Sequence, residues 1–167
     1  MREGLTARDA RGDWRNCLFD NVNRPNVYNS RVSWYEKLGA DYVELAFRAA
    51  RAADPNIKLY YNDNNLEVNL HKAEAVRKMI QDINDRYKRE TGGTRNLIEG
   101  VGTQMHIWDY NLNFNNVRQS LWILSTLGIE IVVTELDIPG PNYIQTYRHD
   151  TDMSERDAIA QALVYAR

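Results

Sequence analysis

The 167-residue chain lacks the features that mark disulfide-rich, membrane-spanning or nucleic-acid-binding proteins. Cys17 is its only cysteine, which excludes an internal disulfide framework and a thiolate metal cluster. The formal net charge is −2, so there is no basic footprint for nucleic acid or for an anionic membrane. No apolar stretch is long enough to span a bilayer. The first four residues begin no apolar run of the kind a signal peptide has. We therefore expect neither a nucleic-acid nor a membrane partner.

A hydrophobic fraction of 43% is enough for a core, and the apolar residues recur in an alternating order. Helical spacing predicts four helices and short apolar runs predict three strands, in the order helix 33–53, strand 57–61, helix 76–87, strand 98–107, helix 117–127, strand 129–138 and a last helix capped by Ser154. This alternation predicts a parallel sheet built from right-handed crossover units. Residues 13–29 show no sustained period, which indicates a long loop.

The run from Ile129 to Ile138 is β-branched and carries two carboxylates near its end. Such a run predicts a strand that is buried on both faces. Because side chains alternate along a strand, Glu135 and Asp137 should point to the same side. A carboxylate at the carboxyl end of a barrel strand is in the place where such enzymes carry out chemistry. The alternative is that Glu135 is only an exposed loop acid.

Polar and aromatic residues follow each of the other two predicted strands. In consecutive β/α units these strand ends lie on one rim, so amides, a histidine, aromatic rings and two acids would converge on one cleft. Amides can exchange hydrogen bonds with sugar hydroxyls, and rings can cover the apolar face of a pyranose. Taken singly, each feature has a structural explanation. The Asn-rich tract at residues 62–65 can be a turn, His106 a hydrogen-bonded structural histidine, and Trp108 a packing residue.

Three of these strand ends, read as motifs, resemble one enzyme family. Residues 58–65, 98–106 and 134–138, together with Trp34, Tyr35 and the helical pattern of 39–47, are similar to the glycoside hydrolase family 10 endo-1,4-beta-xylanases. The similarity runs from about Trp34 to the end of the chain. It implies a (β/α)8 TIM barrel that hydrolyses the β-1,4-xylosidic bonds of xylan with retention, without a cofactor or a metal.

The resemblance also assigns roles to individual residues. It implies that Glu135 is the nucleophile and that His106 and Asp137 hold and tune it. The residues implied to line the sugar subsites are Asn62, Asn65, Gln104, Tyr61 and Trp108. The expected partner is xylan or xylo-oligosaccharides, and by the same resemblance the parent enzyme is expected to be secreted.

The sequence departs from the family pattern at two points. Asn64 stands where the family usually has tyrosine, which removes a stacking ring. The acid/base glutamate belongs to a Trp-Asp-Val-Val-Asn-Glu motif that is absent; residues 19–24 are only superficially similar and end in Arg24. We interpret residues 1–33 as the loop that follows the missing motif and 34–167 as consecutive β/α units. Residues 1–167 would then be a partial catalytic domain, roughly half of a barrel, with exposed sheet edges that favour self-association.

Two other functions remain open. A barrel remnant could bind xylan without hydrolysing it, since the acid/base glutamate is missing. An unrelated α/β enzyme with a carboxylate base, such as an isomerase, is the other. The sequence contains no phosphate loop, dinucleotide fingerprint or metal-ligand cluster that would support that second alternative.

Overall fold

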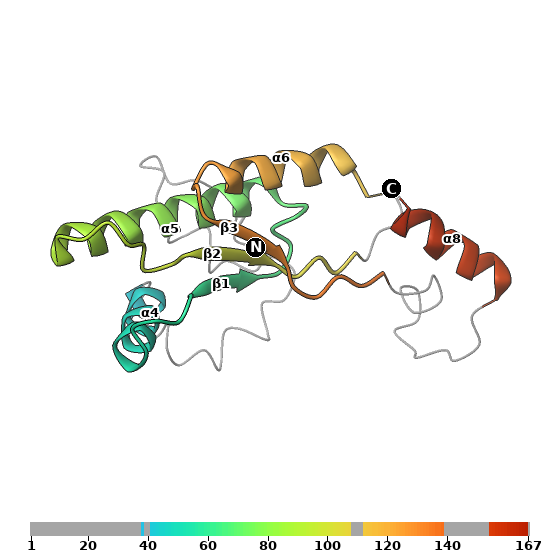
Figure 1. The fold of residues 1–167 in the computed structure, drawn as a ribbon. Helices are drawn as coiled ribbons and strands as arrows, with labels where there is room; N and C mark the ends of the chain where they lie inside the picture. The colour runs from blue at the N-terminus through green and yellow to red at the C-terminus, as the bar shows by residue number, and fades with distance from the viewer. Residues whose placement is uncertain (1–37, 39–40, 108–111, 139–153, 167) are drawn as a thin grey trace.

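The computed structural model describes residue 38 and residues 41–107, 112–138 and 154–166. Helices and strands alternate through this part of the chain (Figure 1), in the order α4 Tyr42–Ala53, β1 Tyr60–Asp63, α5 Leu70–Thr91, β2 Gly100–Thr103, α6 Phe114–Ser125, β3 Glu130–Val133 and α8 Glu155–Tyr165. Of the helices described, none is both long and apolar enough to cross a membrane. The predicted alternation is confirmed.

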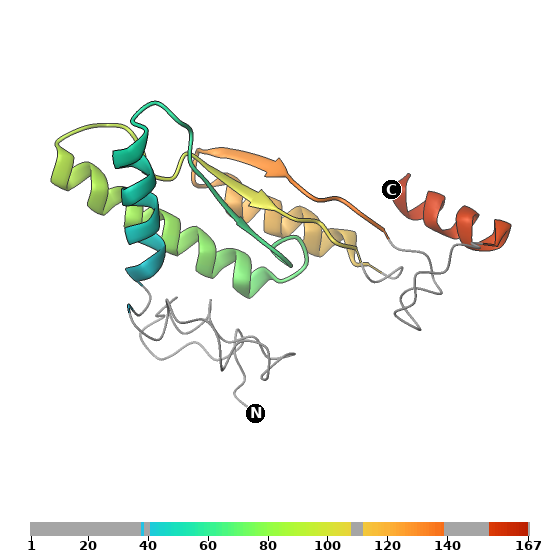
Figure 2. The ribbon, with the colours of Figure 1, turned by 90° about the horizontal axis from the view of Figure 1, so that it is seen from below.

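The three strands form one parallel sheet in the order β1-β2-β3. In its register, Tyr60 pairs with Gly100, and Gly102 pairs with Val132. The parallel arrangement in sequence order is the one that the alternating pattern predicted. Helices α5 and α6 lie on the same face of the sheet in both ribbon views (Figures 1 and 2). The carboxyl ends of all three strands therefore meet at one edge.

Helix α5 supplies much of the core because its apolar residues recur at helical spacing. Val76, Met79, Ile80 and Ile83 are at most 1% exposed and pack in one cluster with Val101 of the central strand. The side chain of Asn69 caps its first turn by accepting from the Lys72 N–H at 3.0 Å. Gly92 ends the helix in the left-handed conformation at φ +68°.

A buried amide on α5 fixes the entry to β2. Asn84 is 5% exposed, and its Nδ2 donates to the carbonyl oxygen of Ile98 at 2.9 Å. Its Oδ1 accepts from the Ile98 N–H at 2.8 Å. Both backbone groups of Ile98 are thus satisfied by one side chain, which joins the helix layer to the sheet.

Two expectations need correction. Strand β3 is not buried on both faces: Glu130 and Val133 are exposed, because β3 is the last strand of the described sheet and α5 and α6 cover one face of that sheet. In α8, the cap at Ser154 is confirmed. The predicted apolar face, however, is largely exposed: Ile159 is 54% and Leu163 60% exposed, and Val164 is the buried residue of that helix. The reason is the same, since few described elements pack against it.

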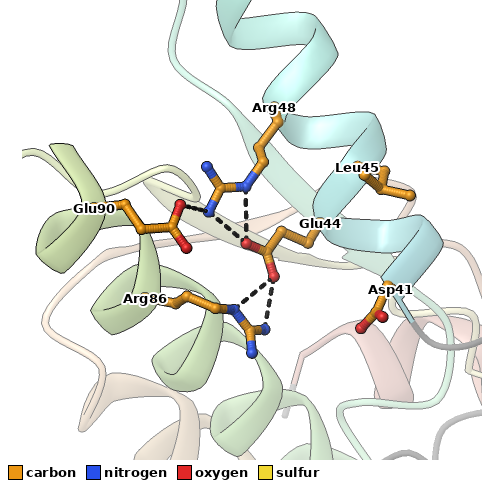
Figure 3. A pocket seen from close by; sticks show the side chains of 6 residues that line it. All are labelled: Asp41, Glu44, Leu45, Arg48, Arg86 and Glu90. Carbon is orange, nitrogen blue, oxygen red and sulfur yellow. Dashed lines mark hydrogen bonds and ion pairs between the residues drawn. The ribbon is translucent and has the colours of Figure 1, made fainter.

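Helix α4 is tied to α5 by a network of ion pairs around a pocket of about 400 Å³ (Figure 3). The Glu44 carboxylate accepts from Arg48 Nε at 2.8 Å and from Arg86 Nε at 2.9 Å, and Arg48 also donates to Glu90 at 2.7 Å. The pocket therefore lies between paired charges in the helix layer. In both ribbon views α4 lies near the end of α5 that is away from the carboxyl ends of the strands (Figures 1 and 2).

Candidate active site

The candidate site lies where the chain leaves β2 and β3. Beyond the regular ladder, the Glu135 N–H donates to the Gln104 carbonyl at 3.0 Å, and the Ile107 N–H donates to the Asp137 carbonyl at 2.9 Å. His106 and Asp137 form an isolated parallel bridge. Met105, between Gln104 and His106 in the sequence, has a φ of +65°, a conformation uncommon for a residue with a side chain. Backbone pairing thus holds the two loops side by side.

His106 lies between the two carboxylates of the last loop. Its Nδ1 is 2.7 Å from Oδ1 of Asp137, and its Nε2 is 3.2 Å from Oε2 of Glu135. The prediction that Glu135 and Asp137 point to one side is therefore confirmed, and His106 lies within hydrogen-bond distance of both carboxylates. A doubly protonated imidazole donates to both acids.

The electrostatics of His106 follow from these neighbours. The hydrogen bond to Asp137 is the largest cause that raises the pKa of His106 above its ordinary value; burial opposes it, and the bond to Glu135 adds a further increase. The imidazole is 28% exposed, and the Glu135 side chain is 44% exposed.

Asn62, at the end of β1, contacts the same carboxylate from the other side. Its Nδ2 donates to Oε1 of Glu135 at 3.2 Å, and its Oδ1 accepts from the Thr134 hydroxyl at 2.9 Å. Thr134 was not singled out in the sequence; its signal is that it directly precedes Glu135. The residues joined in this way, which we call the rim cluster, are Asn62, His106, Thr134, Glu135 and Asp137.

The other predicted site residues do not join the rim cluster in the part of the chain described. Tyr61 points to the opposite face from Asn62, packs against the core and donates to Asp63 Oδ2 at 2.8 Å. Burial, with Asp63 adding to it, raises the pKa of Tyr61 well above its ordinary value. Asn65 is exposed in a turn at φ +56°. Gln104 is half-buried and pairs through its backbone. Trp108 lies outside the described residues.

The Asn-rich tract after β1 is divided between structure and site. Lys72 Nζ donates to Asp63 Oδ1 at 2.7 Å, to the Asn64 carbonyl at 2.8 Å and to Asn64 Oδ1 at 2.9 Å. Asp63 and Asn64 therefore anchor the start of α5. Asn62 is the residue of this tract that reaches the rim cluster.

The rim cluster leaves one carboxylate both oriented and accessible. Oε1 of Glu135 is held by an amide and Oε2 by an imidazole, while the side chain stays partly open to solvent. Such a carboxylate can serve as a nucleophile or a base. Among the described residues, no group of three or more acids, histidines or cysteines is arranged to hold a metal ion.

The sequence is similar to proteins of one known family. A family model described as Glycosyl hydrolase family 10 matches residues 14–166. Endo-1,4-beta-xylanase A of Thermoanaerobacterium saccharolyticum is 41% identical over 113 residues, which is 68% of this chain and 9% of that protein. Exoglucanase XynX of Acetivibrio thermocellus is 41% identical over 105 residues, or 63% of this chain and 9% of that protein. The chain thus spans only a small part of these relatives.

Solved structures give the same result. TsXylA, the intracellular xylanase of T. saccharolyticum, aligns with a TM-score of 0.60 at 36% identity, covering 79% of this chain and 35% of that one. Xylanase 10B of Thermotoga maritima aligns with a TM-score of 0.59 at 36% identity, covering 80% and 36%. The expectation of secretion is wrong as an inference from resemblance, because TsXylA is described as intracellular.

Proposed function

The chain belongs to glycosyl hydrolase family 10, its β/α units are part of a (β/α)8 barrel, and we propose that it is the part of an endo-1,4-beta-xylanase that carries the nucleophile. The observation that carries this proposal is the rim cluster, in which both oxygens of Glu135 are held while the side chain stays accessible. Retaining hydrolysis needs an ionised carboxylate of this kind to attack the anomeric carbon.

In this proposal Glu135 forms the covalent glycosyl-enzyme bond. His106 orients the carboxylate, and Asp137 acts through His106 by holding its other nitrogen. The supporting geometry is the pair of contacts from His106, at 3.2 Å to Glu135 and 2.7 Å to Asp137.

The substrate that we propose is xylan or a xylo-oligosaccharide. Mutants of TsXylA have been crystallised with xylotriose and with xylotetraose, which supports this substrate class for a chain of the same family. We propose sugar contacts for Gln104 and Asn65, which follow β2 and β1, and for Trp108 on the resemblance alone. We propose that Asn62 contacts Glu135 rather than a sugar. Tyr61 faces the core and is not proposed as a sugar contact.

The protonating carboxyl group is proposed to lie outside these 167 residues. The family motif that holds it is absent from the sequence. The prediction that residues 1–33 are the loop after that motif lies outside the described residues, and we propose that 34–167 are consecutive β/α units. In the complete barrel the two carboxyl groups should be about 5–5.5 Å apart, as a retaining mechanism requires.

The nucleophile assignment is tested in a full-length protein that carries this segment. Glu135→Gln should abolish the release of reducing sugar from xylan, because an amide cannot attack the anomeric carbon. Asp137→Asn should do less damage, because it acts through His106. Glu155→Gln, at an exposed position of α8, is the matched control and should leave the activity unchanged. Normal hydrolysis by Glu135→Gln would rule out the assignment.

A second candidate is a barrel unit that binds xylan without hydrolysing it. One observation favours it. Both carboxylates of the rim cluster contact His106, and neither is assigned to protonate a leaving group. Isothermal titration of the isolated chain with xylo-oligosaccharides, beside an assay of phenol release from an aryl xylobioside with an acidic phenol, separates the two functions, because that leaving group needs no proton. Binding without phenol release supports the binding unit, whereas phenol release supports the enzyme.

A further inference from the structure

The central strand carries glycine at two successive positions of one face. Gly100 and Gly102 alternate with Val101, which is in the core, so both glycines face away from α5 and α6. A Cβ at Gly100 would lie 2.2 Å from the ring of Tyr60, and a Cβ at Gly102 would lie 2.5 Å from Oδ1 of Asn62. Both distances are far inside van der Waals contact. The glycines therefore leave the space in which β1 side chains lie over β2.

Through that space, the side chains of Tyr60 and Asn62 on β1 extend across β2 to β3 or to the residues that follow it. The Tyr60 hydroxyl crosses Gly100 and donates to Glu130 on β3. Asn62 crosses Gly102 and meets Thr134 and Glu135 beyond the end of β3. The Thr134 methyl group closes the same space, since a Cβ at Gly102 would lie 3.0 Å from it.

The Thr134 hydroxyl donates to the oxygen of the Asn62 amide, which agrees with the amide orientation that turns its nitrogen towards Glu135. It has one proton, and it lies 2.9 Å from Asn62 Oδ1 and 3.3 Å from the Thr103 carbonyl. Donation to Oδ1 places the amide nitrogen towards Glu135, where it can donate to the carboxylate. If the amide were reversed, its carbonyl oxygen would face the carboxylate, and the hydrogen bond would become a repulsion.

We propose that Thr134 and Gly102 are positioning residues for Glu135: Gly102 leaves room for the Asn62 amide to cross β2, and the Thr134 hydroxyl turns the amide N–H towards Oε1 of Glu135. The proposal rests on the proposed function, in which Glu135 is the nucleophile. In this proposal neither residue acts on the substrate directly. Their effect reaches the reaction only through Asn62.

The kinetic test uses a full-length protein that carries this segment and a 2-fluoro-xylobioside with a dinitrophenyl leaving group. Mass spectrometry follows covalent labelling of Glu135, and the dependence on probe concentration separates binding from bond formation. Thr134→Val removes the hydroxyl at nearly constant volume. It should slow bond formation by about 10- to 100-fold, the effect of one hydrogen bond to a charged group, with little change in probe binding. Thr134→Ser, which keeps the hydroxyl, should retain most of the rate.

Glycine variants provide an independent comparison. Gly102→Ala should slow labelling because its methyl group displaces Asn62. Gly93→Ala is the control, since a Cβ there meets only Thr91 Oγ1 at 3.5 Å, and it should label normally. If Gly102→Ala fails to fold, the Thr134 pair still decides the question. Equal rates for wild type, Thr134→Val and Thr134→Ser would overturn the proposal.

A spectroscopic measurement keeps the two hypotheses apart. In protein labelled with ¹⁵N-asparagine, the Asn62 side-chain N–H signal, identified by its loss in Asn62→Ala, should change in Glu135→Gln. Thr134→Val should abolish that response and Thr134→Ser should keep it. Suppose that Glu135→Gln changes the Asn62 signal when Thr134 is present, but the fluoro-xylobioside does not label Glu135. In that case the proposed function fails while the positioning role holds. An Asn62 signal that ignores Thr134 overturns the positioning role, whether or not labelling occurs.

Discussion

Nδ1 of His106 lies 2.7 Å from Oδ1 of Asp137, and the backbones of the two residues are bridged as well. The Ile107 N–H donates to the Asp137 carbonyl at 2.9 Å, so the loop that carries the imidazole is attached to the loop that carries both acids. This double attachment holds the imidazole so that its Nε2 faces Glu135. Asp137 can therefore affect Glu135 without touching it.

We predict that Asp137→Asn lowers the pKa of His106. The hydrogen bond to Asp137 is the largest cause that raises this pKa, and an amide offers no negative charge to favour the imidazolium. The measurement is the pH dependence of the His106 ring-proton shifts in NMR. Asp85→Asn, an exposed change on α5, removes the same charge at a distance and should leave the titration where it is. An unchanged midpoint in Asp137→Asn would contradict the prediction.

We also predict the direction in which His106 makes stability depend on pH. Because its pKa is raised in the folded state, the stabilisation is fully present below the unfolded value of about 6.5 and is lost as pH rises through the folded value. Urea unfolding across this range should show the free energy of unfolding fall with pH more steeply in wild type than in His106→Gln. A difference of the opposite sign would show that His106 is not held as a cation.

The fold could be predicted to the level of element order. The helical spacing of Val76, Ile80 and Ile83 predicted the helix that covers the sheet. The sequence could not predict how far each strand extends, because the sheet ladder covers four residues of each strand and the pairing beyond it is irregular. Exposure of β3 was missed because β-branched residues suit an edge strand as well as a buried one.

Within the site, acids were easier to predict than the residues that orient them. Glu135, His106 and Asp137 follow from motif and strand geometry. Tyr61 was grouped with Asn62 although neighbours on a strand point to opposite faces, and alternation alone could have separated them. Thr134 and Gly102 act by a hydroxyl and by an absent side chain, and only the register shows that they meet Asn62.

Asn84→Ala should destabilise the chain by about 2–4 kcal/mol, because it leaves the buried N–H and C=O of Ile98 without their partners. The free energy of unfolding is measured by urea denaturation. Asp85→Ala, the exposed neighbour on α5, is the matched control and should change stability little. Equal stability of the two variants would show that the Asn84 bridge is replaced by water at little cost.

The exposed edge of β3 leads us to propose that the isolated chain self-associates. Val133, at the end of β3, is 49% exposed and Leu136, which follows the strand, is 51% exposed; β3 has one partner in the described sheet. Val133→Lys should shift sedimentation towards the monomer, because a charge at an edge opposes strand pairing. Trp122→Lys changes a residue of α6 that is 69% exposed but not on the sheet edge. If Trp122→Lys dissociates the assembly and Val133→Lys does not, the contact is made through the helices.

The last prediction concerns how the isolated chain depends on the leaving group. Retaining hydrolysis uses one carboxyl group to attack and another to protonate the leaving oxygen, and we assign only the first to this chain. Protonation contributes about 10²–10⁴-fold, so unactivated xylan should be hydrolysed poorly or not at all. An aryl xylobioside with an acidic phenol needs no proton on departure and should be the better substrate. Glu135→Gln is the control for both assays and should remove the phenol release. Brisk hydrolysis of unactivated xylan by the purified chain would mean that a second carboxyl group within these residues is placed to act as the acid.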